Sequence, residues 1–168
     1  MVTVTTNVDT SQHDEVVSKI QEVFANTSSI TPRTGRRLRE ALLAGNLAVA
    51  FEGGELVGWL LAIPYSKTVH ELGMAYVQPS GRKRGVLNLL TAELIERSSV
   101  VLTVTYERSF ADSLMRHWGF VDSSLFEFAL LSRGAFIGSR FRSLSSIKSV
   151  FTHVADSKPI YLIKKAEA

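Results

Sequence analysis

One continuous stretch, residues 70–96 (HELGMAYVQPSGRKRGVLNLLTAELIE), constrains the fold of this chain more than any other. It begins with a short strand pattern over residues 71–77, passes through a turn rich in Pro, Gly and basic side chains, and continues as an amphipathic helix. The apolar residues of that helix recur at helical spacing: Val86, Leu87, Leu89, Leu90, Leu94 and Ile95. This order of strand, turn and helix predicts an α/β architecture.

The turn ahead of the helix is suited to hold an anion. It contains three basic residues and a glycine: Arg82, Lys83, Arg84 and Gly85. No Asp or Glu occurs between Glu71 and Glu93, so we expect no repulsion of an anion there. Unpaired amides of the first helical turn favour negative charge, and Gly85 can take the positive φ that shapes a phosphate nest. The sequence predicts a phosphate site, with a solvated basic turn as the alternative.

The composition predicts one folded domain over residues 1–168, since 45% of the residues are hydrophobic and 21% are charged. No apolar run approaches the ~20 residues of a membrane span, and the N-terminus lacks the pattern of a signal peptide. We therefore expect a cytoplasmic location. The net charge of +3 is compatible with an anionic cofactor and too small to indicate nucleic acid.

Metal and thiol chemistry have no support in the sequence. The chain has no cysteine, which excludes a disulfide, a cysteine nucleophile and a thiolate zinc site. The four histidines are widely separated and form no HExxH-like pair: His13, His70, His117 and His153. No metal site is predicted.

Alternating and helical apolar patterns predict the remaining elements. Strands are expected over residues 1–7, 47–64 (a hairpin turning at Gly53 and Gly54), 71–77, 100–106, 125–131 and 159–165. Helices are expected over residues 11–24, from the polar loop to about residue 45, after the phosphate turn, and between residues 134 and 154. The strands at 71–77 and 100–106 are expected to be parallel neighbours joined by the helix.

Two segments allow alternative interpretations. Four arginines cluster before and within the second helix, and they form either a solvated face or an anion-attracting rim: Arg33, Arg36, Arg37 and Arg39. The helix expected within residues 134–154 either packs on the domain or binds a membrane surface or a partner. This helix and the apolar edge strands could also mediate a homodimer.

The turn resembles the coenzyme A-binding motif of the GNAT acetyltransferases, Q/R-x-x-G-x-G/A, which follows a strand and a proline-containing turn and opens a helix. Here the motif reads RKRGVL, with Arg82 at its first position and Gly85 at its first glycine. Leu87 stands where the family prefers Gly or Ala. The resemblance covers residues 47–120 and continues in SFADSLMRHWGFVDSS, where Ala111, Gly119 and Phe120 match.

Two further positions depart from the family pattern. Arg108 stands where the family often has Asn, and Met115 stands where it often has the Tyr that protonates the leaving thiolate. Both departures concern the chemistry of the reaction and leave the fold expectation unchanged. That expectation is a mixed α/β fold whose mostly antiparallel central sheet is flanked by helices.

The resemblance implies direct transfer of an acetyl group from acetyl-CoA to a primary amine, without a covalent enzyme intermediate. It implies that the pyrophosphate is held by the turn and the first helical residues: Arg82, Lys83, Arg84, Gly85, Val86 and Leu87. It also implies that the pantetheine arm pairs with the backbone of a strand that splays from its neighbour: Ala75, Tyr76 and Val77.

For the catalytic base, Glu71 lies as far before Arg82 as a catalytic Glu lies in histone-type members of the family. A solvated charge at a strand end is the alternative for Glu71. His70 is expected to point to the opposite face of the strand. The general acid is Tyr106, His117 or solvent.

The sequence leaves three functions open. The first is an N-acetyltransferase that acts on a small-molecule or peptide amine. The second is an acyl-CoA-binding regulatory module with little or no catalysis. The third is a basic binder of nucleic acid or of an anionic surface, which lacks the exposed aromatic residues and the motifs that such binders use.

Overall fold

The computed structural model describes residues 1–27, 32–141 and 158–166. They form two compact units, of which the first spans Met1–Ala62 and Gly73–Glu96 and the second spans Ile63–Leu72 and Arg97–Ala168. The hydrogen-bonded strand order is β1-β2-β3-β4-β5-β7-β6. Strand β4 (Val69–Val77) contributes its first four residues to the second unit and the rest to the first.

The first unit contains the antiparallel strands β1 (Val2–Thr5), β2 (Leu47–Glu52) and β3 (Glu55–Pro64), followed in the sheet by the end of β4. The predicted hairpin at residues 47–64 is confirmed. Its turn needs glycine because Gly53 and Gly54 have φ values of +59° and +85°, a region that residues with a side chain rarely adopt.

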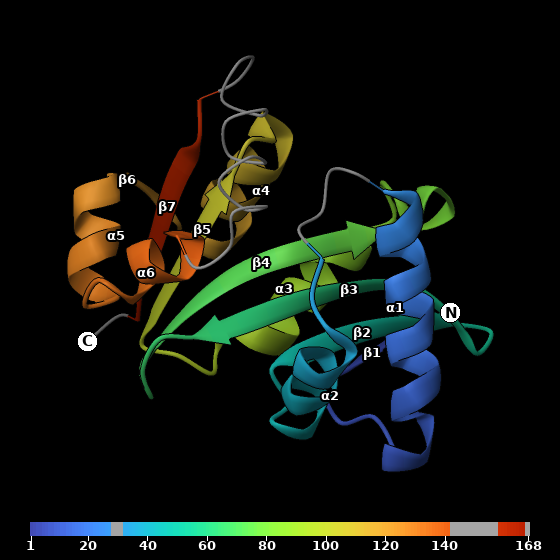
Figure 1. The fold of residues 1–168 in the computed structure, drawn as a ribbon. Coiled ribbons are helices and arrows are strands. Elements are labelled where there is room, and N and C mark those ends of the chain that lie inside the picture. The colour runs from blue at the N-terminus through green and yellow to red at the C-terminus, as the bar shows by residue number, and fades with distance from the viewer. Residues whose placement is uncertain (28–31, 142–157, 167–168) are drawn as a thin grey trace. The chain divides into compact units, whose positions relative to one another are not determined.

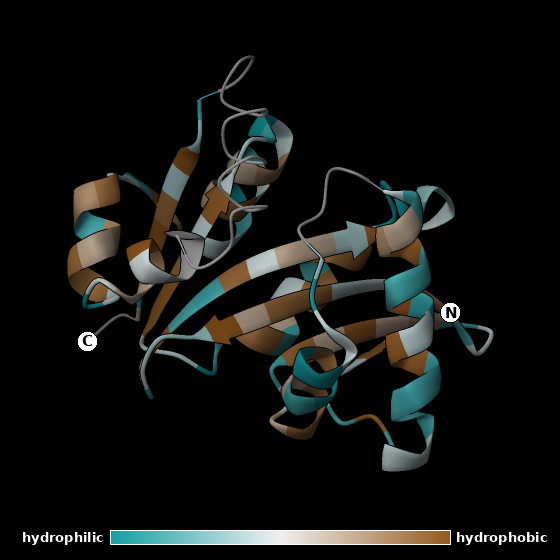
Figure 2. Ribbon diagram, in the orientation of Figure 1, coloured by the Kyte–Doolittle hydropathy of each residue, from teal (hydrophilic) through white to brown (hydrophobic). Residues whose placement is uncertain are grey.

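Helices cover both faces of this part of the sheet (Figure 1). A short 3₁₀ turn (η1, Thr10–Gln12) leads into α1 (His13–Asn26), which lies with α2 (Gly35–Leu43) on one face, while α3 (Val86–Ile95) lies on the other. Strands β2 and β3 are mostly hydrophobic, whereas α2 contains both hydrophilic and hydrophobic residues (Figure 2). Apolar burial between these layers drives their packing.

The second unit contains the strands β5 (Val100–Thr105), β6 (Val121–Ser123) and β7 (Ile160–Lys165). The start of β4 pairs with β5 in parallel, as predicted, and β7 pairs antiparallel with both β5 and β6. Helix α4 (Arg108–Trp118) ends at Gly119, whose φ of +68° forms the left-handed cap.

The core of the second unit combines aliphatic and aromatic side chains. It contains Val69, Leu102, Phe128, Phe136 and Ile163, all buried. Phe128 and Phe136 come from α5 (Leu125–Leu131) and α6 (Ala135–Phe141), and their rings meet edge to face with centroids 5.2 Å apart. These contacts fix the two short helices against the strands.

The prediction of a strand over residues 125–131 is wrong, because this segment is helix α5. Ser124 caps the helix: its side-chain oxygen accepts a hydrogen bond from the Glu127 amide at 3.2 Å. The sequence analysis also missed the short strand β6. Helix α6 occupies the start of the helix predicted within residues 134–154, and residues 142–154 lie outside the described residues. Among the described residues, no helix combines the length and the apolar character that a bilayer span requires.

Candidate functional site

The predicted phosphate turn lies in the first unit, between the end of β4 and α3. Chain direction reverses through a short 3₁₀ turn (η2, Pro79–Gly81), and the left-handed residue Gly85 (φ +75°) occupies the N-cap of α3 without any side-chain cap. A Cβ built on Gly85 would meet nothing within 4 Å. Glycine is therefore favoured here by backbone conformation, and open space lies in front of the uncapped first turn of α3.

The three basic side chains of the turn differ in their partners. The Nε atom of Arg82 donates to the Val77 carbonyl at 3.2 Å, and Lys83 is exposed with a positive φ of 62°. Arg84 forms two hydrogen bonds with the Glu52 carboxylate, at 2.6 and 2.7 Å. These bonds lower the pKa of Glu52 and raise that of Arg84. No acidic residue was expected to repel an anion at the turn, but folding brings the Glu52 carboxylate of β2 to Arg84.

Ala75, Tyr76 and Val77 form the end of β4. The parallel register between β4 and β5 runs only from Val69 opposite Val100 to Leu72 opposite Thr103, so these three residues lie beyond it. Just after the register ends, Met74 has a positive φ of 56°, which interrupts the regular strand conformation.

Gln78 ties the end of β4 to β3 through two hydrogen bonds. Its amide nitrogen donates to the Val57 carbonyl and its side-chain Nε2 donates to the Leu56 carbonyl, both at 2.9 Å. Close approach of the two strands also requires Gly58, since a Cβ there would lie 2.8 Å from the Tyr76 carbonyl oxygen. The backbone before the phosphate turn is thus held firmly against β3.

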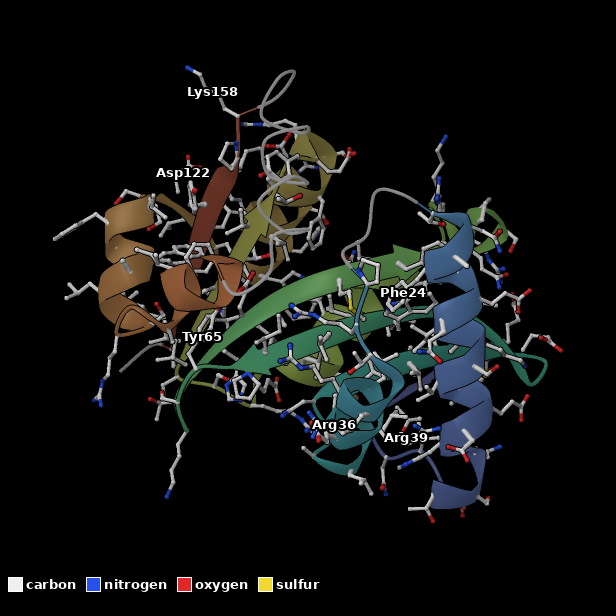
Figure 3. All side chains as sticks on the ribbon, viewed as in Figure 1. Phe24, Arg36, Arg39, Tyr65, Asp122 and Lys158 are labelled. Atoms are coloured by element: carbon white, nitrogen blue, oxygen red, sulfur yellow. The ribbon has the colours of Figure 1, made fainter. Side chains whose placement is uncertain are left out.

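A pocket of about 300 Å³ lies beside this strand end in the first unit. Its wall is formed by the C-terminal part of α1, the start of β3 and the end of β4: Lys19, Glu22, Val23, Asn26, Thr27, Glu55, Leu56, Trp59, Tyr76 and Gln78. The Trp59 and Tyr76 rings are stacked with centroids 4.5 Å apart, and Phe24, which points from α1 toward the sheet, meets Trp59 edge-on (Figure 3). The sequence analysis did not identify this pocket, because its residues come from three separate segments.

Glu71, the predicted base, lies in the second unit and is only 2% exposed. Its interpretation as a solvated charge is therefore wrong. The Tyr65 hydroxyl donates a hydrogen bond to the Glu71 carboxylate, and the Tyr65 ring packs edge-on against Phe136 with centroids 6.4 Å apart. Tyr65 follows the end of β3, where the chain turns toward β4 (Figure 3). Tyr65 was not among the predicted site residues, although its place in the connection between two predicted strands was a usable signal.

His70 makes a separate contact. Its Nδ1 atom is hydrogen-bonded to the Ser98 hydroxyl, whereas the neighbouring Glu71 is bonded to Tyr65. Burial lowers the pKa of His70, and the positive charge of Arg97 lowers it further. His70 is therefore held mainly as the neutral imidazole at neutral pH.

Neither candidate acid, Tyr106 or His117, has a contact with Glu71 among those described above. Tyr106 is half-buried and follows β5, four residues after Leu102, which is the partner of Glu71 in the sheet. Four strand residues correspond to roughly 13 Å. His117 is exposed near the end of α4, and Met115 on the same helix is half-buried. Within the second unit, the structure thus brings Glu71 together with Tyr65 and leaves Tyr106 farther along the strand.

The arginine cluster resembles a solvated face. Arg36, Arg37 and Arg39 are exposed, and two of them are ion-paired: Arg36 with Glu40 at 3.8 Å and Arg39 with Asp14 at 2.6 Å. Arg36 and Arg39 belong to α2 and are labelled in Figure 3. These pairs offset much of the positive charge that an anionic polymer would need.

Comparisons with known proteins identify the fold. No protein-family model matches the sequence, and no curated protein matches it significantly. Solved structures do resemble the chain. N-acetylglutamate synthase from Neisseria gonorrhoeae, complexed with coenzyme A and N-acetyl-glutamate, matches with a TM-score of 0.60 and 14% identity over 100% of this chain. The match covers 36% of the synthase, so the chain spans about a third of that protein.

Two other solved structures match over nearly their whole length. The yncA protein from Salmonella typhimurium, solved with its cofactor acetyl-CoA, has a TM-score of 0.63 and 11% identity over 100% of this chain and 95% of its own. An acetyltransferase of the GNAT family from Staphylococcus aureus Mu50 has a TM-score of 0.60 and 13% identity over 99% and 100% of the two chains. At these identities the likeness establishes the fold.

Proposed function

We propose that this chain, whose fold is that of the GNAT acetyltransferases, moves an acetyl group from acetyl-CoA to a primary amine. The observation that carries the proposal is the uncapped start of α3, reached through the left-handed Gly85 and facing open space. Such a helix start binds phosphate groups through its free amides. The turn follows residues of β4 that lie beyond the parallel register with β5, and this position supports the same assignment.

The residues at the turn fit a pyrophosphate. In this proposal the backbone amides of Gly85, Val86 and Leu87 hold it, and Lys83 supplies positive charge, helped by Arg82 and Arg84. The absent Cβ at Gly85 leaves room for phosphate oxygens to approach the backbone. The backbone of Ala75, Tyr76 and Val77, beyond the register with β5, would hold the pantetheine arm.

Acetyl-CoA, when bound, supplies a thioester whose carbonyl carbon is bonded by the acceptor nitrogen and whose sulfur leaves and takes up a proton. Glu71 would accept the proton that the acceptor nitrogen loses, directly or through water. Tyr65 would hold the Glu71 carboxylate in position through its hydroxyl hydrogen bond. The proton for the sulfur would come from Tyr106, His117 or solvent, since the thioether of Met115 carries no acidic proton.

A second candidate function is an acyl-CoA-binding module with little catalysis. The observation that favours it is the burial of Glu71, because a carboxylate that is 2% exposed offers little surface to an amine or a water molecule. Leu87, half-buried where the resembling motif has a small residue, also narrows the approach to the turn.

Release of free coenzyme A thiol tests the proposal. The chain would be incubated with acetyl-CoA and a panel of primary amines, and thiol formation would be followed with a colorimetric reagent. We expect amine-dependent thiol release that Glu71→Gln reduces strongly. Binding of coenzyme A without any amine-dependent release would support the binding module instead.

A further inference from the structure

The pocket beside the end of β4 carries an inference about a second ligand. It has a volume of about 300 Å³, within the range of small-molecule sites, and lies entirely within the first unit. Four kinds of observation describe its chemistry: the orientation of two amide side chains, the balance of charge, the aromatic wall, and the face of β4 from which it opens.

The two carboxamides in the pocket wall each donate a hydrogen bond through the side-chain nitrogen. Asn26 donates its Nδ2 to the Glu22 backbone carbonyl, and Gln78 donates its Nε2 to the Leu56 carbonyl, both at 2.9 Å. A carbonyl oxygen can only accept, so these contacts fix the orientation of each amide. The side-chain oxygens of Asn26 and Gln78 remain as acceptors without a partner in the described part of the chain.

The pocket wall carries a net negative charge, because it contains one lysine, Lys19, and two carboxylates, Glu22 and Glu55. Lys19 is bound by the Glu15 carboxylate at 2.9 Å and by Glu55 at 3.5 Å. The hydrogen bond that Lys19 donates to Glu15 raises the pKa of Lys19 and keeps its charge. Glu22, in contrast, forms no ion pair within residues 1–27, 32–141 and 158–166. Its carboxylate is the charge that remains available to a ligand.

The aromatic wall adds both apolar surface and an unused donor. Trp59 is 1% exposed, and its indole Nε1 has no hydrogen-bond partner among the described residues. A buried N–H without a partner is costly, so we expect an acceptor such as a water molecule to complete its hydrogen bonding. Val23 and Leu56 contribute aliphatic surface, and the face of Tyr76 can attract a cation.

The pocket opens on the opposite face of β4 from the phosphate turn. A Cβ at Gly58 would contact Val77 and Leu90 of α3, at 3.4 and 3.5 Å, so Val77 faces the α3 side. The preceding residue, Tyr76, faces the α1 side and stacks on Trp59, since side chains alternate along a strand. One strand end therefore separates the pocket from the turn.

From these observations we propose that the pocket binds an organic ammonium ion with an apolar substituent, recognised by Glu22 and the side-chain oxygens of Asn26 and Gln78. An ammonium ion brings three donors and one positive charge, which match the three acceptors and the negative wall. Binding of this ammonium ion does not depend on the proposed acetyl transfer.

Calorimetric titration of the chain without any coenzyme A tests the proposal. The probes are pentan-1-amine, which is protonated at neutral pH, and its neutral counterpart pentan-1-ol. We expect the amine to bind about tenfold or more tightly than the alcohol, the effect of one charge-assisted hydrogen bond. Glu22→Gln should remove this preference and leave coenzyme A binding unchanged.

Glu96→Gln is the matched control, because it removes the same charge from an exposed position in the first unit outside the pocket. It should keep the preference for the amine. Equal binding of amine and alcohol, no binding of the amine, or an equal loss in Glu22→Gln and Glu96→Gln would overturn the proposal. Because no coenzyme A is present, such a failure is distinct from a failure of the proposed acetyl transfer.

Discussion

The Tyr65 hydroxyl donates a hydrogen bond to the buried carboxylate of Glu71, six residues farther along the chain. The two residues lie on either side of the connection between β3 and β4, and the Tyr65 ring is fixed by its edge-on contact with Phe136 of α6. The carboxylate thus has a defined partner in a largely dry environment. This pair gives the proposed reaction its base.

The pair predicts different effects for two conservative substitutions. Glu71→Gln keeps the shape of the side chain and removes the base, so we expect kcat to fall by about 10²- to 10⁴-fold with coenzyme A affinity retained. Tyr65→Phe removes only the hydroxyl and should lower kcat less. Steady-state kinetics across pH would measure both, and the pH–rate profile of Tyr65→Phe should differ from that of the unsubstituted chain. Unchanged profiles in both variants would exclude Glu71 as the base.

The contact between Arg84 and Glu52 predicts an unusual gain in affinity. Glu52→Gln removes a negative charge beside the phosphate turn and releases Arg84 from its two hydrogen bonds. We expect coenzyme A to bind about two- to fivefold more tightly, the range typical of one exposed ion pair. Glu40→Gln, which removes an exposed carboxylate paired with Arg36, is the control. Weaker binding in Glu52→Gln would indicate that Glu52 holds Arg84 in its binding position.

The close approach of β3 and β4 predicts a loss of stability in Gly58→Ala. The added Cβ would lie 2.8 Å from the Tyr76 carbonyl oxygen, so the strands must move apart. We expect the free energy of unfolding to fall by about 1–3 kcal/mol in urea denaturation. Gly138→Ala is the matched control, because a Cβ at this helical position meets nothing within 4 Å. An equal effect of the two substitutions would contradict the crowding at Gly58.

His70 predicts a pH dependence of stability. Its pKa is lowered in the folded chain, chiefly by burial, so the unfolded chain binds the proton more tightly. Stability should therefore decrease as pH falls below the unfolded value of about 6.5, and level off below the folded pKa. Thermal unfolding between about pH 7.5 and 5.5 measures this slope. The slope should be smaller in His70→Asn, and an identical slope in that variant would exclude His70 as its source.

Local sequence signals predicted most of the first unit correctly. The hairpin at Gly53 and Gly54, the strand before the phosphate turn and the helix after it all depend on neighbouring residues, and the structure contains each of them. The alternation in residues 125–131 was misleading. It suggested a strand with one apolar face, yet Phe126 and Leu130 are 78% and 67% exposed while Phe128 is fully buried. The Ser124 side chain caps the first turn of residues 125–131, which favours a helix there.

The features that the sequence did not predict depend on contacts between distant segments. Glu52 reaches Arg84 only because β2 and the phosphate turn fold together, 32 residues apart in the chain. The pocket beside Trp59 likewise combines residues of α1, β3 and β4. Residue spacing could identify the phosphate turn, whereas the charges and cavities around it required the fold.

Calorimetric titration with coenzyme A tests the central claim most directly, using the unsubstituted chain, Gly85→Asp and Gly134→Asp. Both glycines have a left-handed φ, +75° and +77°, and a Cβ at either meets nothing within 4 Å, so the two variants carry matched backbone strain and charge. We predict binding in the micromolar range that Gly85→Asp abolishes and Gly134→Asp retains, because only the first places a carboxylate at the start of α3. Absence of binding by the unsubstituted chain, or unchanged affinity in Gly85→Asp, would contradict the account.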